Sequence, residues 1–202
     1  EELFIAIKAL REAVGPAFEA ASDRQLFSYL TRWLDNYMLK TISWEHFSVG
    51  PPLSFNINLE TLRSPEFADF EKRRPPKWHD RVMLELQLAD VWADFPGFLE
   101  ISQRLKQNGY LRCLDGVVFS ALRFLNLRRL EVDYVKLIWD DGLLKLSADA
   151  LRELCLSVAE CGKDRIILTR CGRDEAVRVG RVLGIQLFQG WTINGANSSA
   201  QT

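Results

Sequence analysis

The sequence lacks the features that mark several common classes of protein. It has no run near the roughly 20 consecutive apolar residues of a membrane-spanning helix, and its 26 basic residues are balanced by 27 acidic ones. Nucleic-acid binders and polybasic membrane anchors both need an excess of positive charge. We therefore expect no nucleic-acid partner and no membrane insertion by this segment.

Cysteine is scarce as well, and no C-x-x-C pair occurs. Most of the cysteines sit in or beside apolar runs, which predicts buried free thiols and argues against a disulfide framework or a zinc site; they are Cys113, Cys155, Cys161 and Cys171. The start of the chain carries neither a basic leader nor a small-residue cleavage site, so a cytoplasmic protein is expected. A first residue other than Met and the polar end NGANSSAQT predict a segment of a longer protein whose residues 194–202 form a disordered tail.

The chain has ample material for a hydrophobic core. Apolar residues make up 48% of its 202 residues, a length that suits one large domain, expected over residues 1–193. Short β-rich runs alternate with stretches of helical periodicity. The predicted strands lie near the start (3–10) and at 53–59, 81–88, 111–119, 132–139, 165–171 and 185–191, and the predicted helices at 23–42, 64–73, 95–108, 120–130, 147–162 and 173–184.

This alternation predicts an α/β fold with a parallel sheet buried on both faces. Ser64 and Ser147 are placed to cap helices, and the glycines that follow helices, Gly109, Gly162 and Gly184, suit the left-handed turn back into a strand. In about 200 residues such a sheet is either a βα barrel or a doubly wound sheet.

Polar residues interrupt the apolar strands close to their carboxyl ends, where barrels of this type carry their chemistry. They are Asn56, Asn58, Glu85, Asp115, Lys136 and Gln189. Polar groups inside a sheet cost free energy unless they are satisfied. The set therefore indicates a pocket with two carboxylates, carboxamides and a lysine, which suits a hard metal ion and a phosphate ligand.

The order and spacing of these residues resemble the EAL domain, the module that linearises the bacterial second messenger cyclic di-GMP. The matched segments are Lys8-Ala9-Leu10, Asn58-Leu59-Glu60, Glu85-Leu86-Gln87-Leu88, Asp115-Gly116, Asp133-Tyr134-Val135-Lys136, Thr169-Arg170-Cys171-Gly172 and Gln189-Gly190. The family motifs at these places are Glu-Ala-Leu, Asn-Leu-Ser, Glu-Leu-Thr-Glu, Asp-Asp-Phe-Gly, Asp-x-x-Lys, Ala-Glu-Gly-Val-Glu and Gln-Gly. The resemblance implies a TIM-like (βα) barrel of the EAL type whose first strand is missing or lies upstream of residue 1.

Several carboxylates with which the family holds two divalent cations are replaced in this sequence. Lys8, Leu88, Gly116 and Thr169 stand where the family has Glu, Glu, Asp and Glu. A lysine in a cation site places positive charge where the ion needs negative ligands. The resemblance therefore implies a bacterial, catalytically inactive, degenerate phosphodiesterase with no catalytic residue, no metal site and no cofactor.

The residues that remain imply a residual ligand pocket. It would consist of Asn58, Glu85, Asp115, Lys136, Gln189 and, with a shift in position, Arg11. The pocket either binds cyclic di-GMP or is a structural network that binds nothing. The resemblance thus implies a signalling domain that acts through a protein partner or a homodimer, with the segment 120–130 as the contact region. The alternatives are an active phosphodiesterase with an altered metal site and a purely structural dimerisation domain with an empty pocket.

Overall fold

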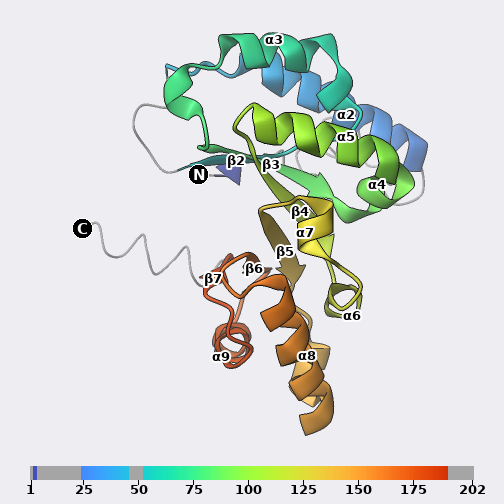
Figure 1. Cartoon of the computed structure of the whole chain (residues 1–202), viewed down its shortest axis with the longest axis vertical. Coiled ribbons are helices and arrows are strands. Elements are labelled where there is room, and N and C mark those ends of the chain that lie inside the picture. Colours follow the sequence, from blue (N-terminus) through green and yellow to red (C-terminus); the bar gives the residue numbers. More distant parts are fainter. Residues whose placement is uncertain (1, 4–23, 46–51, 191–202) are drawn as a thin grey trace, which may run out of the picture. The chain divides into compact units, whose positions relative to one another are not determined.

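The structure, a computed structural model, describes residues 2–3, 24–45 and 52–190. It divides into two compact units, of which the first ends at Leu111 and the second begins at Arg112. In both, strands alternate with helices along the chain (Figure 1). The α/β class that the sequence predicts is confirmed, whereas the single domain over residues 1–193 stays a prediction.

The strands of the first unit run parallel to one another and follow the order of the chain. They are β1 (Glu2–Leu3), β2 (Leu53–Asn56) and β3 (Val82–Gln87). In the register of β2 and β3, Leu53 pairs with Val82 and Asn56 pairs with Glu85. Strands occur at both predicted places, 53–59 and 81–88, but they are shorter than predicted, since β2 ends at Asn56 and β3 spans Val82–Gln87. Most of the first predicted strand lies outside the described residues.

Helices α2 (Arg24–Thr41), α3 (Pro65–Arg73) and α5 (Phe95–Gln107) lie on one side of β2 and β3 (Figure 1). All three match predicted helices, and Ser64 caps α3 by accepting a hydrogen bond from the amide of Phe67 at 3.2 Å. Short turns η1 (Thr61–Arg63) and η2 (Pro76–Trp78) complete the unit together with α4 (Leu88–Ala93). The assignment of Leu88 to the preceding strand is wrong, because β3 ends at Gln87 and Leu88 opens α4.

Alternation along the strands separates an apolar face from a polar one. In β2, Leu53 and Phe55 are fully buried, whereas Ser54 and Asn56 are half-buried. Phe55 meets Phe70 of α3 edge to face, with ring centroids 5.9 Å apart. Burial of one such side chain contributes roughly 1.5–3 kcal/mol, so the helices hold the apolar face and leave polar residues on the other.

The second unit also has parallel strands in chain order. They are β4 (Leu111–Val117), β5 (Tyr134–Ile138), β6 (Ile166–Thr169) and β7 (Leu187–Phe188). Each lies inside a predicted strand. The prediction for 185–191 is too long among the described residues, since only Leu187 and Phe188 pair with β6.

The main helices of the second unit are α8 (Ala148–Cys161) and α9 (Asp174–Val182), with a 3₁₀ turn η3 (Asp141–Lys145) between β5 and α8. Ser147 caps α8 as predicted, by accepting from the amide of Ala150 at 3.2 Å. The glycines that were expected to end helices take positive φ angles of 68°, 98° and 87°; they are Gly109, Gly162 and Gly184. These predictions are confirmed.

The segment 120–130 does not form the single helical stretch that its periodicity predicts. It contains two one-turn helices, α6 (Phe119–Leu122) and α7 (Leu127–Leu130). Asn126 interrupts them because its φ of −103° and ψ of 94° are not helical, and its side chain accepts from the amide of Arg129. The capping preference of asparagine therefore overrides the apolar periodicity.

The core of the second unit forms between its strands and its helices. Val135, Leu137, Ile166 and Leu168 are fully buried.

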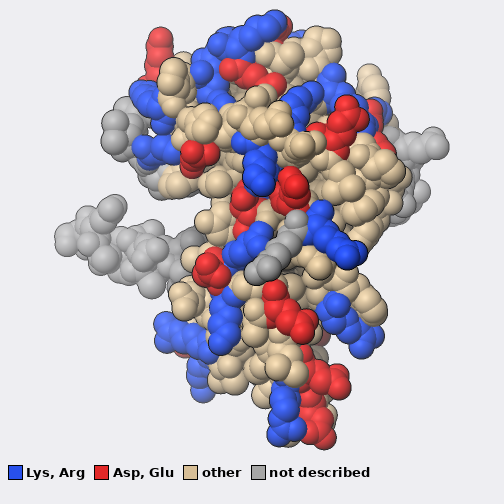
Figure 2. Space-filling model, viewed as in Figure 1, with Lys and Arg blue, Asp and Glu red and all other residues tan. Residues whose placement is uncertain are grey.

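All four cysteines are free, with Cys155 half-buried and the other three buried, as the sequence predicts. On the face drawn in Figure 2, basic and acidic side chains are interspersed. No helix among the described residues is both long and apolar enough to cross a bilayer.

Candidate functional site

The polar face of the first unit carries Glu85 beside two carboxamides. Asn56 and Glu85 are register partners on the parallel strands β2 and β3, so their side chains share a face. Gln87, two residues further along β3, donates from Nε2 to Oδ1 of Asn56 at 3.3 Å. Only 1% of the Glu85 surface is exposed. A buried carboxylate on this face is the arrangement expected of a ligand pocket.

Asn58 is held by α2 through a carboxylate that the sequence analysis did not single out. One oxygen of Asp35, Oδ2, accepts from the backbone amide of Asn58 at 2.8 Å, from its Nδ2 at 2.6 Å and from Thr61 Oγ1 at 2.9 Å. Thr31 Oγ1 lies 3.4 Å from Asn58 Oδ1. The carboxamide of Asn58 is therefore oriented by α2 where the chain leaves β2.

Asp35 is 8% exposed, and burial is the main cause that raises the pKa of its carboxyl group above the ordinary value of 3.8. Hydrogen bonds from Asn58 and Thr61 oppose that rise, and the nearby charge of Asp90 adds to it. A signal for Asp35 exists in the sequence. It lies four residues before the fully buried Leu39, so a carboxylate occupies the apolar face of a helix.

In the second unit, Asp115 and Lys136 come together at an irregularity of the sheet. Leu114 pairs with Val135 but Val117 pairs with Leu137, so β4 carries one extra residue and Asp115 and Gly116 lie together opposite Lys136. Gly116 adopts a φ of 77°, and Asp115 Oδ1 accepts from the amide of Gly116 at 2.7 Å. Lys136 is 5% exposed.

Thr169 and Gln189 continue this arrangement on the next strands. Lys136 pairs with Ile167 and Ile138 pairs with Thr169, so Thr169 shares the face of Lys136. The hydroxyl of Thr169 donates to the carbonyl of Leu137 at 3.3 Å. The amide of Gln189 donates to the carbonyl of Leu168 at 2.8 Å, which extends the pairing of β7 with β6 as far as Gln189.

The glycine after Gln189 is required by packing. A Cβ atom on Gly190 would lie 2.3 Å from the carbonyl oxygen of Cys171 and 2.6 Å from its backbone nitrogen. Backbone atoms cannot yield as a flexible side chain can. The Gln-Gly pair therefore permits the close approach of the chain after β7 to the chain after β6.

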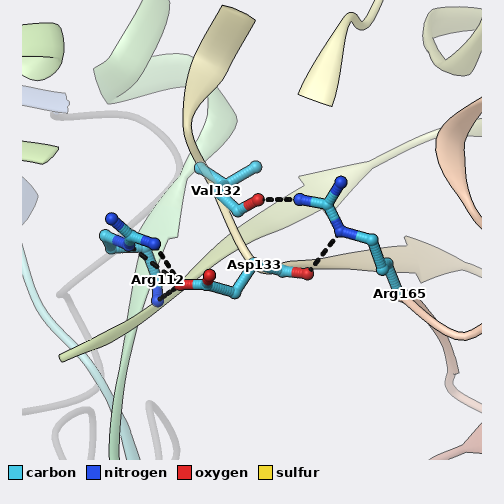
Figure 3. A network of polar contacts seen from close by, with 4 residues as sticks. All are labelled: Arg112, Val132, Asp133 and Arg165. Atoms are coloured by element: carbon cyan, nitrogen blue, oxygen red, sulfur yellow. Dashed lines mark hydrogen bonds and ion pairs between the residues drawn. The ribbon is translucent and has the colours of Figure 1, made fainter. Parts of the chain in front are cut away.

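Asp133, the first residue of the Asp-x-x-Lys match, serves the opposite end of the strands. Its Oδ2 accepts from the Nε and Nη2 of Arg112 at 2.9 and 2.6 Å and from the amide of Arg112 at 2.8 Å (Figure 3). Arg165 donates from Nε to the carbonyl of Asp133 at 3.0 Å and from Nη2 to that of Val132. The network joins the amino ends of β4, β5 and β6, away from Lys136.

Five of the six predicted site residues thus lie at or near the carboxyl ends of strands. The second unit places Asp115 and Lys136 on the neighbouring strands β4 and β5 and Gln189 at the end of β7, which lies on the other side of β6, and the first unit holds Glu85 and Asn58. Arg11 lies outside the described residues, as does Lys8. In the described part of the chain, no group of three or more His, Cys, Asp and Glu side chains is placed to hold a metal ion.

Comparison with known structures identifies the fold. The chain is similar to the Xanthomonas citri FimX EAL domain in complex with c-diGMP, with 15% identity, a TM-score of 0.62, and coverage of 87% of this chain and 72% of that one. It is also similar to Klebsiella pneumoniae BlrP1 in a manganese/cy-diGMP complex, with 18% identity, a TM-score of 0.61, and coverage of 85% and 45%. A third similar structure is Vibrio cholerae LapD S helix-GGDEF-EAL bound to c-di-GMP, with 15% identity, a TM-score of 0.58, and coverage of 82% of this chain and 42% of that one.

These similarities show a TIM-like EAL fold, as the sequence resemblance implies. The chain spans less than half of the length of BlrP1 and of the LapD segment. No curated protein sequence matches it. The model of the EAL domain family matches residues 11–196, which is nearly the whole sequence. The chain therefore belongs to the EAL domain family.

Proposed function

We propose that this EAL domain is a non-catalytic signalling module that binds cyclic di-GMP and transmits binding through protein contacts. Three of the structures that it resembles contain the nucleotide: the FimX EAL domain, the LapD segment and BlrP1, the last also with manganese. Because nucleotide complexes occur on this fold with and without a named metal, binding and hydrolysis are separate questions for this chain.

The observation that carries the proposal is the Asp115–Gly116 irregularity in β4. Gly116 stands where the family has a second aspartate, and its φ of 77° lies in the left-handed region that favours glycine. Glycine adopts this conformation without strain, and aspartate, although it enters the left-handed region more readily than most residues, adopts it less easily than glycine. The backbone conformation at residue 116 therefore suits the glycine of this chain, which supports the proposed loss of the carboxylate.

The remaining donors do not fit a pair of divalent cations. A hard cation such as Mg²⁺ takes about six oxygen ligands in strict geometry. The carboxylates left from the matched motifs near the carboxyl ends of the strands are Glu85 in the first unit and Asp115 in the second. Thr169, where the family has Glu, supplies only a hydroxyl that already donates to a carbonyl. No hydrolytic step through paired metals is supported by this set.

The same residues suit binding of a phosphodiester. Lys136 brings a positive charge to a nearly buried position, where attraction to an anion is stronger than in water. In the same unit, Gln189 adds a carboxamide that can donate and accept hydrogen bonds with phosphate oxygens and base edges. A nearly buried lysine and a half-buried carboxamide therefore support binding of an anionic ligand without a metal ion.

The test is calorimetry with cyclic di-GMP in the presence and absence of Mn²⁺ or Mg²⁺, combined with analysis of the nucleotide after incubation. Binding that is unchanged by the divalent ion, with intact nucleotide, is the expected result. Conversion to the linear dinucleotide would overturn the proposal in favour of an active phosphodiesterase. Absence of binding would leave a structural domain with an empty pocket.

Lys136→Ala distinguishes between two hypotheses, that Lys136 belongs to a ligand-binding pocket and that it belongs to a purely structural network. A ligand site predicts that affinity falls about tenfold or more while the domain stays folded. A structural network predicts a loss of stability of about 3–5 kcal/mol because a buried partner charge is stranded. Lys145→Ala, which removes an exposed lysine of η3, is the matched control and should change neither property.

The partner and the location belong to the same proposal. The segment 120–130 remains the proposed contact region for a protein partner or a second copy. It exposes 71% of Phe124, with the guanidinium of Arg123 4.7 Å from the ring centroid. A cytoplasmic location in a bacterium fits a receptor for a soluble second messenger.

Size-exclusion chromatography of Phe124→Ala against the parent chain tests the contact region, since a dimer built on this segment should dissociate.

A further inference from the structure

Arg170 has an unusual backbone conformation at the carboxyl end of β6. Its φ of 61° lies in the left-handed region, which among the described non-glycine residues is shared only by Asp80 and Glu131. Asp and other short polar residues enter this region more readily than a long side chain such as arginine. Strain of this kind persists only where the surrounding structure imposes it, and it often marks functional positions.

The hydrogen bonds around Arg170 show what imposes the conformation. The amide of Gln189 donates to the carbonyl of Leu168 at 2.8 Å, and the amide of Cys171 donates to the carbonyl of Gln189 at 3.0 Å. The hydrogen bonds that continue the pairing of β6 with β7 thus skip Arg170. The carbonyl of Arg170 instead accepts a hydrogen bond from the amide of Gly172 at 2.8 Å. Arg170 is therefore an extra residue in the strand end, directly beside Gln189 of the proposed pocket.

The side chain of Arg170 is exposed and makes no hydrogen bond or ion pair within the part of the chain that the structure describes. The acidic groups that follow β5 are engaged elsewhere. Asp141 is 3.4 Å from Arg173 and accepts from Trp139 Nε1 at 2.9 Å, and Asp140 accepts from the amide of Gly142. The guanidinium is left with its positive charge at the end of the strand.

The match to the family motif indicates which family residues Thr169 and Arg170 replace. Within Ala-Glu-Gly, Thr169 takes the place of the glutamate and Arg170 takes the place of the glycine. Two adjacent changes thus remove a negative charge and add a positive one at the same strand end. A strained residue replaces glycine, the residue that fits the left-handed conformation without strain, so the guanidinium is gained at a cost in stability.

We infer that Arg170 binds a phosphate group of the nucleotide, so that an arginine holds the anion at the strand end where a metal ligand has been lost. A guanidinium binds phosphate oxygens through two parallel hydrogen bonds, and Lys136, on the neighbouring strand β5, supplies a second cation. The inference rests on the proposed function, because the ligand is the phosphodiester of that same pocket. It adds a residue that the resemblance does not carry over.

Arg170→Gly is the decisive variant, because binding and stability should move in opposite directions. Removal of the strained side chain should raise the melting temperature, while affinity for cyclic di-GMP without divalent ions should fall about tenfold or more. Arg170→Asn, which also tolerates the left-handed region, should bind as weakly as the glycine variant. Arg181→Ala removes an exposed arginine from the last turn of α9 and should leave affinity within about twofold of the parent.

Pyrophosphate is the second probe, read as the rise in melting temperature that it produces. If the parent binds cyclic di-GMP and Arg170→Gly and Arg170→Asn bind it equally well, the inference fails while the proposed function stands. If the parent does not bind cyclic di-GMP but loses its pyrophosphate response in both Arg170 variants, the proposed function fails and the anion site stands. If the parent responds to neither probe, both fail.

Discussion

At the residue scale, the buried carboxylate of Asp35 controls the loop that carries Asn58. Its Oδ2 accepts hydrogen bonds from two nitrogens of Asn58 and from the hydroxyl of Thr61. Burial raises the pKa of Asp35, so the ionised form is less favourable in the folded protein than in the unfolded chain. One side chain of α2 therefore both positions a candidate ligand residue and makes stability depend on pH.

We predict that Asp35→Asn removes this pH dependence. The folded state binds the Asp35 proton more tightly than the unfolded state. The Asp35 contribution to the free energy of unfolding is therefore largest below the ordinary pKa of 3.8 and falls as the pH rises through the raised folded pKa. Relative to the parent, Asp35→Asn should become steadily more stable across that interval and then level off.

Urea unfolding of both proteins between about pH 3 and pH 7 measures this difference. Asp69→Asn, which removes a carboxylate from an exposed ion pair with Lys72, controls for the loss of one negative charge. A difference between Asp35→Asn and the parent that stays constant over the whole range would contradict the prediction.

At the scale of elements, the network of Arg112, Asp133 and Arg165 joins three strands at their amino ends (Figure 3). Arg112 is 4% exposed, and Asp133 is an ion-pair partner of its buried guanidinium, at 2.6 Å. Arg165 instead binds main-chain carbonyls in the segment that leads into β5. The arrangement aligns the starts of β4, β5 and β6 and thereby sets which residues reach the opposite ends.

We predict that Asp133→Ala lowers the free energy of unfolding by about 3–5 kcal/mol, because the buried guanidinium of Arg112 loses an ion-pair partner. Chemical denaturation measures the loss. Asp149→Ala breaks an exposed pair with Arg152 and should have little effect, since such pairs contribute little to stability. Equal effects of the two substitutions would show that the Arg112 charge is compensated in another way.

At the scale of the whole molecule, the chain divides into two compact units with the division after Leu111. The matched EAL motifs are shared between them, with Glu85 and Asn58 in the first and Asp115, Lys136 and Gln189 in the second. Compact units of this kind often open separately in the native state. Local stability in one unit can then change without an equal change in the other.

We predict that Gly190→Ala lowers hydrogen-exchange protection in β5 and β6 but not in β2 and β3. The added Cβ would collide with the backbone of Cys171 beside β6, within the second unit. Gly172→Ala is the matched control, because a Cβ there meets nothing within 4 Å. An equal loss of protection in both units would show instead that the chain opens as one cooperative body.

Much of the fold follows from local patterns. Ser64 and Ser147 cap α3 and α8 as expected, because a serine before a helix can satisfy an amide of the first turn in almost any surroundings. β2, β3 and β5 follow from short runs of apolar and β-branched residues. The segment 120–130 was predicted wrongly, because Asn126 had no visible reason to prefer a cap over a helix interior until its backbone angles were known.

The candidate site was less accessible from sequence. The polar residues of β3, β4 and β5 were found because they interrupt apolar strands. Asp35 was missed because it lies more than 20 residues before Asn58, and nothing local links the two. Asp133 belongs to the same motif as Lys136, yet it serves the opposite end of the strands, which only the pairing of Arg112 with Asp133 reveals.

There is a physical reason why the sequence determines some features of this protein and only the tertiary structure decides others. Periodicity, caps and motif order depend on neighbours along the chain, so the amino-acid order already sets the α/β class, most helix ends and the family. Conformations such as those of Gly116 and Arg170, and the burial of Asp35, depend on strand register and on side chains that are distant in sequence. Those contacts exist only once the chain has folded, and they decide which polar residues are engaged in holding the structure together.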